Sequence, residues 1–154
     1  MITVSVATIK DIELIVPMFE AYRRFYEAEP NPEGALQFIS DRISRSESRI
    51  FLAYKQETGG RIPAGFTQLY PSFSSVSMKR LWILNDLFVR PEFRRSGAGA
   101  ALMEKAREFA KEDGAKGLSL ATRPHNETAQ ALYVKMGYKL DTQFLHFNHY
   151  FQAA

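Results

Sequence analysis

The residues from Arg94 to Gly99 have the types and spacing of a phosphate-binding turn. Two arginines and a serine precede two glycines separated by one alanine, and an apolar stretch ends just before them at Val89. A helix that begins at these glycines offers unpaired N–H groups and a positive dipole end to an anion. Glycine permits close backbone approach, and arginine adds charge-assisted hydrogen bonds. The pattern predicts a diphosphate-binding loop, although a turn with solvated arginines has the same residues.

Two other phosphate motifs do not fit this stretch. A P-loop requires Lys followed by Ser or Thr after its last glycine, whereas Ala100 and Ala101 follow Gly99. A dinucleotide fingerprint requires a third small residue where this chain has Leu102. Any phosphate bound here is therefore expected to be held by a different type of phosphate-binding loop.

A second polar set begins at Asn126. Asn126, Ala129 and Tyr133 stand at i, i+3 and i+7, which places them on one face of a helix. The face begins with an amide, has a small residue in the middle and ends with a phenol, so a chain-like ligand has room to pass. An N-cap asparagine and a tyrosine at the core edge would give the same spacing.

The elements that must position these residues follow from hydrophobic periodicity and from capping and turn residues. Strands are expected over 3–7, 50–54, 64–70, 81–89 and 118–122, with two more within 138–151, and a loop over 71–75. Helices are expected after Thr8, after Asn31, over 97–113, and from Asn126 to Gly137. The strand–helix order of the second half implies a parallel crossover in a mixed sheet. The sequence thus predicts one domain over residues 1–154, of the α/β (α+β) class.

Taken together, the two motifs resemble the GNAT superfamily of N-acetyltransferases. Arg94–Gly99 resembles its Arg/Gln-x-x-Gly-x-Gly/Ala signature, and Asn126–Tyr138 resembles its Asn-x-x-Ala-x-x-Leu/Phe-Tyr-x-x-x-Gly-Phe/Tyr pattern. The resemblance implies the acyl-CoA N-acyltransferase fold, with a mostly antiparallel, twisted, mixed sheet of about six to seven strands and about four helices. It also implies acetyl-CoA as cofactor. The implied cofactor-binding residues are Leu87, Phe88, Val89, Arg94, Arg95, Ser96, Gly97, Ala98, Gly99, Ala100, Asn126, Ala129 and Tyr133.

The resemblance also implies catalytic roles. In the family, the tyrosine at the position of Tyr133 donates a proton to the departing thiolate. A backbone N–H of residues 87–89 is the candidate donor to the developing oxyanion. Asp86 is a candidate general base through water, but a structural role is equally consistent; Asn85 stands where some relatives carry a carboxylate and cannot act as a base. The chain has no cysteine, which favours direct attack in a ternary complex.

The expected acceptor is a primary amine of a small molecule, either polyamine-like or amino-acid-like. Aromatic rings beside carboxylates suit a cationic amine, although core packing is the alternative role for the rings. Alternative functions are acetylation of a protein lysine or N-terminus, and a non-catalytic acyl-CoA sensor. The resemblance places the acceptor site on the first two helices and a strand-to-strand loop. Candidate acceptor-binding residues are Tyr22, Tyr26, Glu27, Tyr70, Ser72 and Asn85, with Phe73 and Trp82 as further candidates.

Composition limits the remaining classes of partner and location. The formal net charge of +3 is mild, and the arginines at 90, 94 and 95 lack interleaved exposed aromatics, which argues against a nucleic-acid partner. No apolar run reaches the roughly 18 residues of a membrane span, and no signal-peptide pattern is present. A cytoplasmic protein without a membrane partner or a metal site is therefore expected. Because members of the family are often dimers, a homodimer is a further expectation.

Overall fold

The structure is a computed structural model that describes residues 1–152. It divides into two compact units, Met1–Ala121 and the residues from Thr122 onward. The first unit holds the sheet and helices α1 to α3, and the second holds helix α4. The single domain over residues 1–154 stays a prediction.

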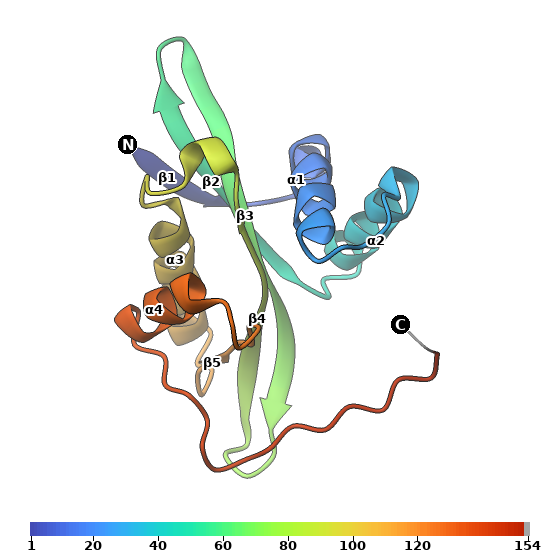
Figure 1. Cartoon of the computed structure of the whole chain (residues 1–154), viewed down its shortest axis with the longest axis vertical. Coiled ribbons are helices and arrows are strands. Elements are labelled where there is room, and N and C mark those ends of the chain that lie inside the picture. Colours follow the sequence, from blue (N-terminus) through green and yellow to red (C-terminus); the bar gives the residue numbers. More distant parts are fainter. Residues whose placement is uncertain (153–154) are drawn as a thin grey trace. The chain divides into compact units, whose positions relative to one another are not determined.

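Five strands form one sheet in the first unit, in the order β1-β2-β3-β4-β5 (Figure 1). The strands are β1 (Ile2–Val6), β2 (Arg49–Glu57), β3 (Gly60–Ser74), β4 (Lys79–Val89) and β5 (Leu118–Ser119). The first four pair antiparallel, and β5 pairs parallel with β4. The mixed, mostly antiparallel sheet is confirmed, but within residues 1–152 it has fewer strands than the six to seven expected.

The two strands expected within 138–151 do not form, because residues 138–152 contain no strand. Hydrogen bonds there are local: the Asp141 carboxylate accepts from the N–H groups of Gln143 and Phe144. Aromatic alternation favours a strand only where a neighbouring strand supplies the ladder. The strand expected over 118–122 is also shorter than predicted, because its ladder with β4 ends at Ser119, opposite Ile83.

The prediction of a loop over 71–75 is also wrong, because β3 continues through Pro71 to Ser74. The β2–β3 ladder ends at Leu69, opposite Arg49, so Pro71 lies where β3 pairs only with β4. A proline is tolerated there because its missing N–H removes no ladder bond on the unpaired side.

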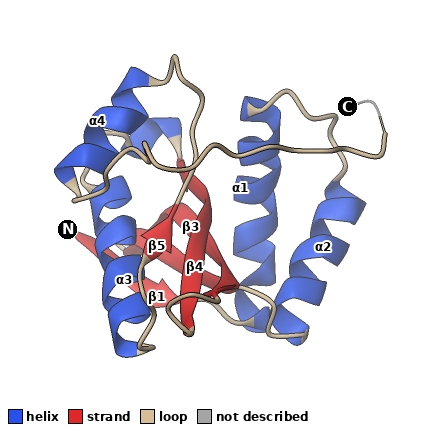
Figure 2. Ribbon diagram, turned by 90° about the horizontal axis from the view of Figure 1, so that it is seen from below, coloured by secondary structure: helices blue, strands red, loops and turns tan. Residues whose placement is uncertain are grey.

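Helices cover both faces of this sheet (Figure 2). Helix α1 (Ile12–Phe25) follows a 3-10 turn whose N-cap, Thr8, forms a capping box with Asp11. Helix α2 (Pro32–Ser44) begins behind Asn31, whose side chain accepts from the Gly34 N–H. Helix α3 (Ala98–Glu112) lies on the opposite face from these two. The helix starts at Thr8, Asn31 and Gly97 are therefore confirmed.

The core of the first unit has two layers. Phe66 and Phe88 pack with Ile15, Phe19 and Ile39 on the α1 face. On the other face, the Phe109 ring of α3 packs edge-on against Phe51 and Trp82, at 5.7 and 4.9 Å between ring centroids. Each buried side chain of this size stabilises the fold by about 1.5–3 kcal/mol, so the two layers fix β3 and β4 firmly between the helices.

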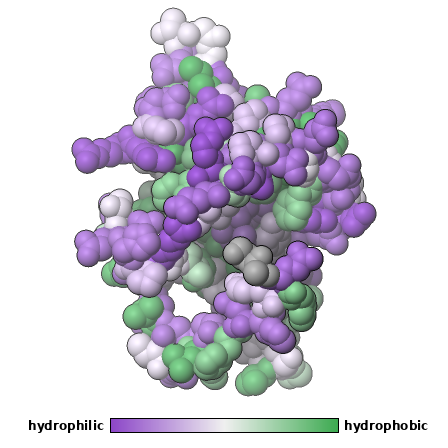
Figure 3. Space-filling view, turned by 45° about the vertical axis from the view of Figure 1, so that its right-hand side comes forward, coloured by the Kyte–Doolittle hydropathy of each residue, from purple (hydrophilic) through white to green (hydrophobic). Residues whose placement is uncertain are grey.

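The surface seen in Figure 3 is mainly hydrophilic, with hydrophobic residues in small separate groups. Within residues 1–152, no helix combines the length and the hydropathy that crossing a membrane requires.

Candidate active site

Strand β4 carries a one-residue bulge at Asn85. Gln68 lies opposite Asp86 and Leu69 lies opposite Leu84, so Asn85 has no opposite residue on β3. A bulge resets the alternation of side chains along a strand. Trp82, before the bulge, packs on α3, whereas Phe88, after it, belongs to the core beneath α1. The bulge therefore turns Asp86 toward the α1 face.

The backbone N–H groups of Leu87 and Val89 point away from β3. Arg90 donates its N–H to the Ala64 carbonyl of β3 at 2.8 Å, and successive residues of a strand point to alternate sides. In agreement, the Val89 carbonyl accepts from the Arg94 Nε at 3.3 Å. Because β5 pairs with β4 only at Trp82 and Ile83, no strand of residues 1–152 pairs with this edge beyond Ile83. Two of the predicted cofactor-binding residues thus present backbone donors at an unpaired edge.

The turn into α3 leaves a row of backbone donors without partners. Arg95 and Gly97 have left-handed φ angles of 66° and 90°, and Gly97 is the N-cap. The first bond of α3 runs from the Ala101 N–H to the Gly97 carbonyl at 3.0 Å. The N–H groups without a hydrogen-bond partner in the described chain are those of Arg95, Gly97, Ala98, Gly99 and Ala100.

This row fits a diphosphate group. Helix α3 has no acidic residue in its first turn, and the side chains of Arg94 and Arg95 are exposed. A Cβ placed on Gly97 would meet no atom within 4 Å, so the turn faces open space. Free amides at a helix N-terminus beside guanidinium groups form an anion site. Ser96 adds a buried hydroxyl with no partner among residues 1–152.

A buried carboxyl lies beside the bulge. Asp86 is 2% exposed, and its carboxylate accepts from Gln68 Nε2 at 2.6 Å and from Asn85 Nδ2 at 2.8 Å. The Tyr22 hydroxyl lies close enough to this carboxylate to affect its pKa. Burial raises the pKa of Asp86 above its ordinary value, and the neighbouring Gln68, Asn85 and Tyr22 side chains oppose that rise only in part. Gln68 could not be predicted as a site residue, because a single glutamine within an apolar strand carries no signal of its partner.

Two phenols flank this carboxyl. The Tyr22 hydroxyl donates to the Asn85 carbonyl at 3.1 Å, and its ring contacts that of Tyr26 at 5.1 Å. Burial raises the pKa of Tyr22 and of Tyr70, and the negative charge of Asp86 raises both further. Both phenols are therefore protonated at neutral pH. The structure brings together Tyr22, Tyr26, Tyr70 and Asn85 from the candidate acceptor residues, together with Asp86.

Two other acceptor candidates lie less centrally. Ser72 is half-buried on β3, two residues beyond Tyr70 and hence on the same face of the strand. Glu27 follows the C-terminal end of α1, where it is exposed and has a left-handed φ of 63°.

Trp82 and Phe73, the further candidates, lie on the α3 face instead. Trp82 Nε1 donates to Asp113 Oδ2 at 2.9 Å, and Arg80 lies over the rings of Phe73 and Trp82. Both side chains therefore lie on the strand face opposite α1, whereas Tyr70 lies beside Asp86 on the α1 face.

The second unit contains the other predicted residues. Asn126 caps helix α4 (Glu127–Lys135): its Oδ1 accepts from the Ala129 N–H at 3.2 Å, while its Nδ2 has no hydrogen-bond partner among residues 1–152. The helix ends at Gly137, whose φ is 96°, with a bond from the Tyr138 N–H to the Tyr133 carbonyl at 2.9 Å. The rings of Tyr133 and Tyr138 lie 6.2 Å apart. Burial raises the pKa of Tyr138 to about 12.

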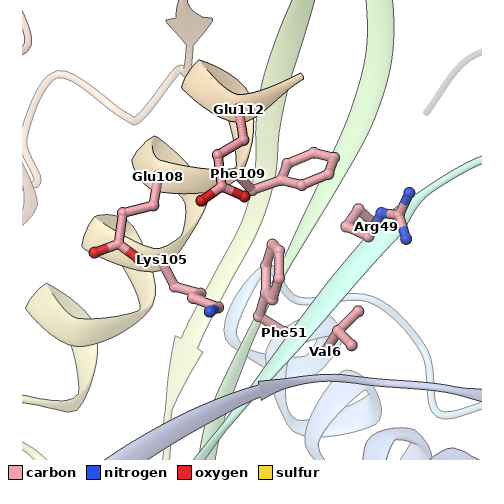
Figure 4. Close-up of a pocket in the computed structure, with 7 residues that line it drawn as sticks. All are labelled: Val6, Arg49, Phe51, Lys105, Glu108, Phe109 and Glu112. Carbon is pink, nitrogen blue, oxygen red and sulfur yellow. The ribbon is translucent and has the colours of Figure 1, made fainter. Parts of the chain in front are cut away.

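A pocket of about 270 Å³ lies elsewhere in the first unit, between α3 and strands β1 and β2 (Figure 4). It is lined by Val6, Arg49, Phe51, Lys105, Glu108, Phe109 and Glu112 and by none of the predicted site residues. Its volume lies below the usual range of ligand pockets. Within residues 1–152, no group of three or more His, Asp or Glu side chains is placed to hold a metal ion.

Comparisons with known proteins agree with this arrangement. The model of the acetyltransferase (GNAT) family matches residues 15–138. An uncharacterized N-acetyltransferase of Bacillus subtilis (strain 168), YhfO, is 48% identical over 141 residues, which are 92% of each chain. A thialysine N-epsilon-acetyltransferase of Caenorhabditis elegans is 35% identical over 82% of this chain and 76% of its own.

A solved structure agrees with the sequence relatives. The crystal structure of a probable acetyltransferase is similar with a TM-score of 0.92 and 36% identity, and the match covers 99% of both chains. The family model and the relatives together show that the chain belongs to the acetyltransferase (GNAT) family and is an acyl-CoA-dependent N-acetyltransferase.

Proposed function

We propose that this protein transfers the acetyl group of acetyl-CoA to the primary amine of a polyamine-like or amino-acid-like small molecule. The observation that carries the proposal is the row of unpartnered N–H groups of Arg95 and Gly97–Ala100 at the start of α3. A diphosphate carries two or more negative charges, and a helix N-terminus with adjacent arginines is a favourable site for them.

Acetyl-CoA would be held by three groups of residues. The amides and guanidinium groups of the segment 94–100 bind the diphosphate. The β4 edge provides backbone donors and acceptors of Leu87 and Val89 for the amide-rich arm, with Phe88 between them facing β3. Asn126 and Ala129 contribute an unpartnered side-chain amide and a small residue on helix α4.

When bound, acetyl-CoA supplies a thioester, whose carbonyl carbon is open to attack by a neutral amine. The N–H of Leu87 or Val89 is the proposed donor to the carbonyl oxygen, where negative charge develops, because it is already oriented and has no strand partner. The hydroxyl of Tyr133 is the proposed proton donor to the leaving sulfur, and Asp86 is the proposed base.

The acceptor amine would lie among Tyr22, Tyr26, Tyr70 and Asn85, with Ser72 farther along β3 and Glu27 just beyond the end of α1. Aromatic faces near a carboxyl attract an ammonium group and hold it until it loses a proton. The thialysine N-epsilon-acetyltransferase among the relatives acts, by its name, on a small amino acid, which supports a small amine as substrate.

Two measurements test the proposal. Isothermal titration of the wild-type protein with acetyl-CoA should give saturable binding, and binding no tighter than millimolar would refute the cofactor. Thiol release should then be followed with polyamines, free amino acids and peptides that carry a lysine or a free N-terminus. Turnover that is fastest with free small amines supports the proposal. Turnover with peptides alone would identify a protein acetyltransferase, and binding without any turnover would identify an acyl-CoA sensor.

A further inference from the structure

The general base of the proposed reaction is too deeply buried to meet an amine directly. Asp86 is 2% exposed, and its two carboxylate oxygens already accept from Gln68 and Asn85. The residue that can connect it to a substrate is Tyr22, which is only partly buried and whose hydroxyl interacts with both the Asn85 carbonyl and the Asp86 carboxylate.

We propose that the Tyr22 hydroxyl relays a proton from the acceptor amine to the Asp86 carboxylate. This inference rests on the proposed function and adds a catalytic role for Tyr22. In the resting protein the hydroxyl donates to the Asn85 carbonyl at 3.1 Å. Rotation about the C–O bond turns the same O–H toward Asp86, which leaves an oxygen lone pair free for the amine.

The step is balanced in protons and charge. An N–H bond of the ammonium breaks as its proton binds to Tyr22 Oη, while the original O–H bond of Tyr22 breaks as that proton binds to an Asp86 oxygen. The amine becomes neutral and the carboxylate becomes a carboxylic acid, so no charge is left on the phenol. After the product leaves, the proton returns to solvent by the reverse route.

The surroundings suit such a relay. The groups that face this pair are Tyr26 at the C-cap of α1, Tyr70 and Gln68 from β3, Asn85 from β4 and, near Tyr70, Arg42 from α2. Burial raises the pKa of Asp86 toward the range in which a carboxylate is an effective base. Burial also raises the pKa of Tyr22, so the phenol exchanges protons without remaining ionised.

The kinetic test uses the variants Tyr22→Phe and Asp86→Asn and two acceptors of one scaffold, one with an α-amine of pKa about 8 and one with an ε-amine of pKa about 10.4. At pH 7 each variant should lower kcat for the ε-amine by about 10²-fold, because the base is lost. The deficit should shrink as the pH approaches the pKa of the amine, and should be small for the α-amine at pH 8.5. The double variant should be no slower than the single ones, because the two groups act as a unit.

The matched controls are Tyr54→Phe and Asp113→Asn, which should keep the wild-type pH profile. Tyr54 is a buried tyrosine in β2 away from the site, and Asp113 lies on the α3 face. A deficit of equal size at every pH, or a double variant with multiplied losses, would overturn the relay while leaving the acetyltransferase proposal in place. Failure of the wild-type protein to acetylate any amine would instead refute both proposals.

A second readout needs no turnover. The Asp86 carboxyl can be titrated by carbon-13 NMR in the free protein, and its pKa should rise in Tyr22→Phe because the carboxylate loses a hydrogen-bond donor. An unchanged titration of Asp86 would show that the two groups are not coupled and would refute the relay.

Discussion

Gln68 Nε2 donates to Asp86 Oδ2 at 2.6 Å across the β3–β4 pair, while Gln68 Oε1 has no partner among residues 1–152. Both side chains are buried; burial raises the pKa of Asp86, and its hydrogen-bond donors lower it to a smaller extent. A carboxylate held in this way is expected to serve activity at a cost in stability, because an ionised group is unfavourable in an apolar interior.

Asp86→Asn should therefore increase stability at neutral and higher pH. Because burial raises the pKa of Asp86 in the folded chain, the folded state binds more protons than the unfolded state between the two pKa values. The free energy of unfolding of the wild-type protein then falls as the pH rises above the ordinary aspartate value of about 3.9. Asp86→Asn has no ionising carboxyl, so its free energy of unfolding does not fall in this way. If the Gln68 amide rotates by half a turn, its Oε1 can accept a hydrogen bond from the amide introduced at position 86.

Urea unfolding of the wild-type protein and Asp86→Asn at a series of pH values measures this effect. The two curves should converge at acid pH and separate, with the variant more stable, as the pH rises. A variant that is less stable at pH 8 than at pH 4, relative to the wild-type protein, would show that the ionised carboxylate stabilises the fold.

Substitution of Gly97 should separate backbone strain from charge. Gly97 has a φ of 90° and open space at its Cβ position, so Gly97→Gln and Gly97→Glu should share a strain cost of about 1–2 kcal/mol. Only the glutamate adds a negative charge beside the free amides. Titration calorimetry should therefore show acetyl-CoA binding that is weaker by about tenfold or more in Gly97→Glu than in Gly97→Gln.

Gly114→Glu is the matched control for Gly97, because Gly114 also has a left-handed φ, of 76°, and open space at its Cβ position, but lies at the other end of α3. Its acetyl-CoA affinity should remain that of the wild-type protein. If the two Gly97 variants bound acetyl-CoA with equal affinity, the diphosphate would not bind at this turn.

Tyr133→Phe should lower kcat by about 10²-fold with a much smaller change in KM, because a proton donor acts in the transition state and not in the bound ground state. Steady-state thiol release at saturating acetyl-CoA measures this split. Tyr138→Phe removes the neighbouring hydroxyl, which is buried and has no partner in residues 1–152, and should retain wild-type kcat. Similar losses in both variants would argue for a packing role of the tyrosine pair.

Trp82→Phe should lower stability without affecting catalysis. The substitution removes the bond from Nε1 to Asp113 and part of the contact with Phe109, which should cost about 1–3 kcal/mol in the free energy of unfolding. Since Trp82 lies on the α3 face, kcat/KM for small amines should stay near the wild-type value. A large loss of kcat/KM in a fully folded variant would show that Trp82 contributes to the acceptor site.

Elements that depend on local sequence patterns were predictable without a structure. The caps at Thr8, Asn31 and Asn126, the stop at Gly137 and the glycine start of α3 are short-range features, so they were predicted correctly. The family also follows from the sequence, because its two motifs are contiguous stretches of residues.

Features that depend on residues far apart in the chain could not be predicted in this way. The expected strands in the aromatic segment 138–151 did not form and β3 ran through Pro71, because a strand exists only where a ladder partner lies beside it. The bulge at Asn85, the Gln68–Asp86 bond and the contact of Tyr22 with Asn85 join residues from separate elements. No spacing in the sequence encodes which side of a bulged strand a side chain will face, and this orientation separates Asp86 from Trp82.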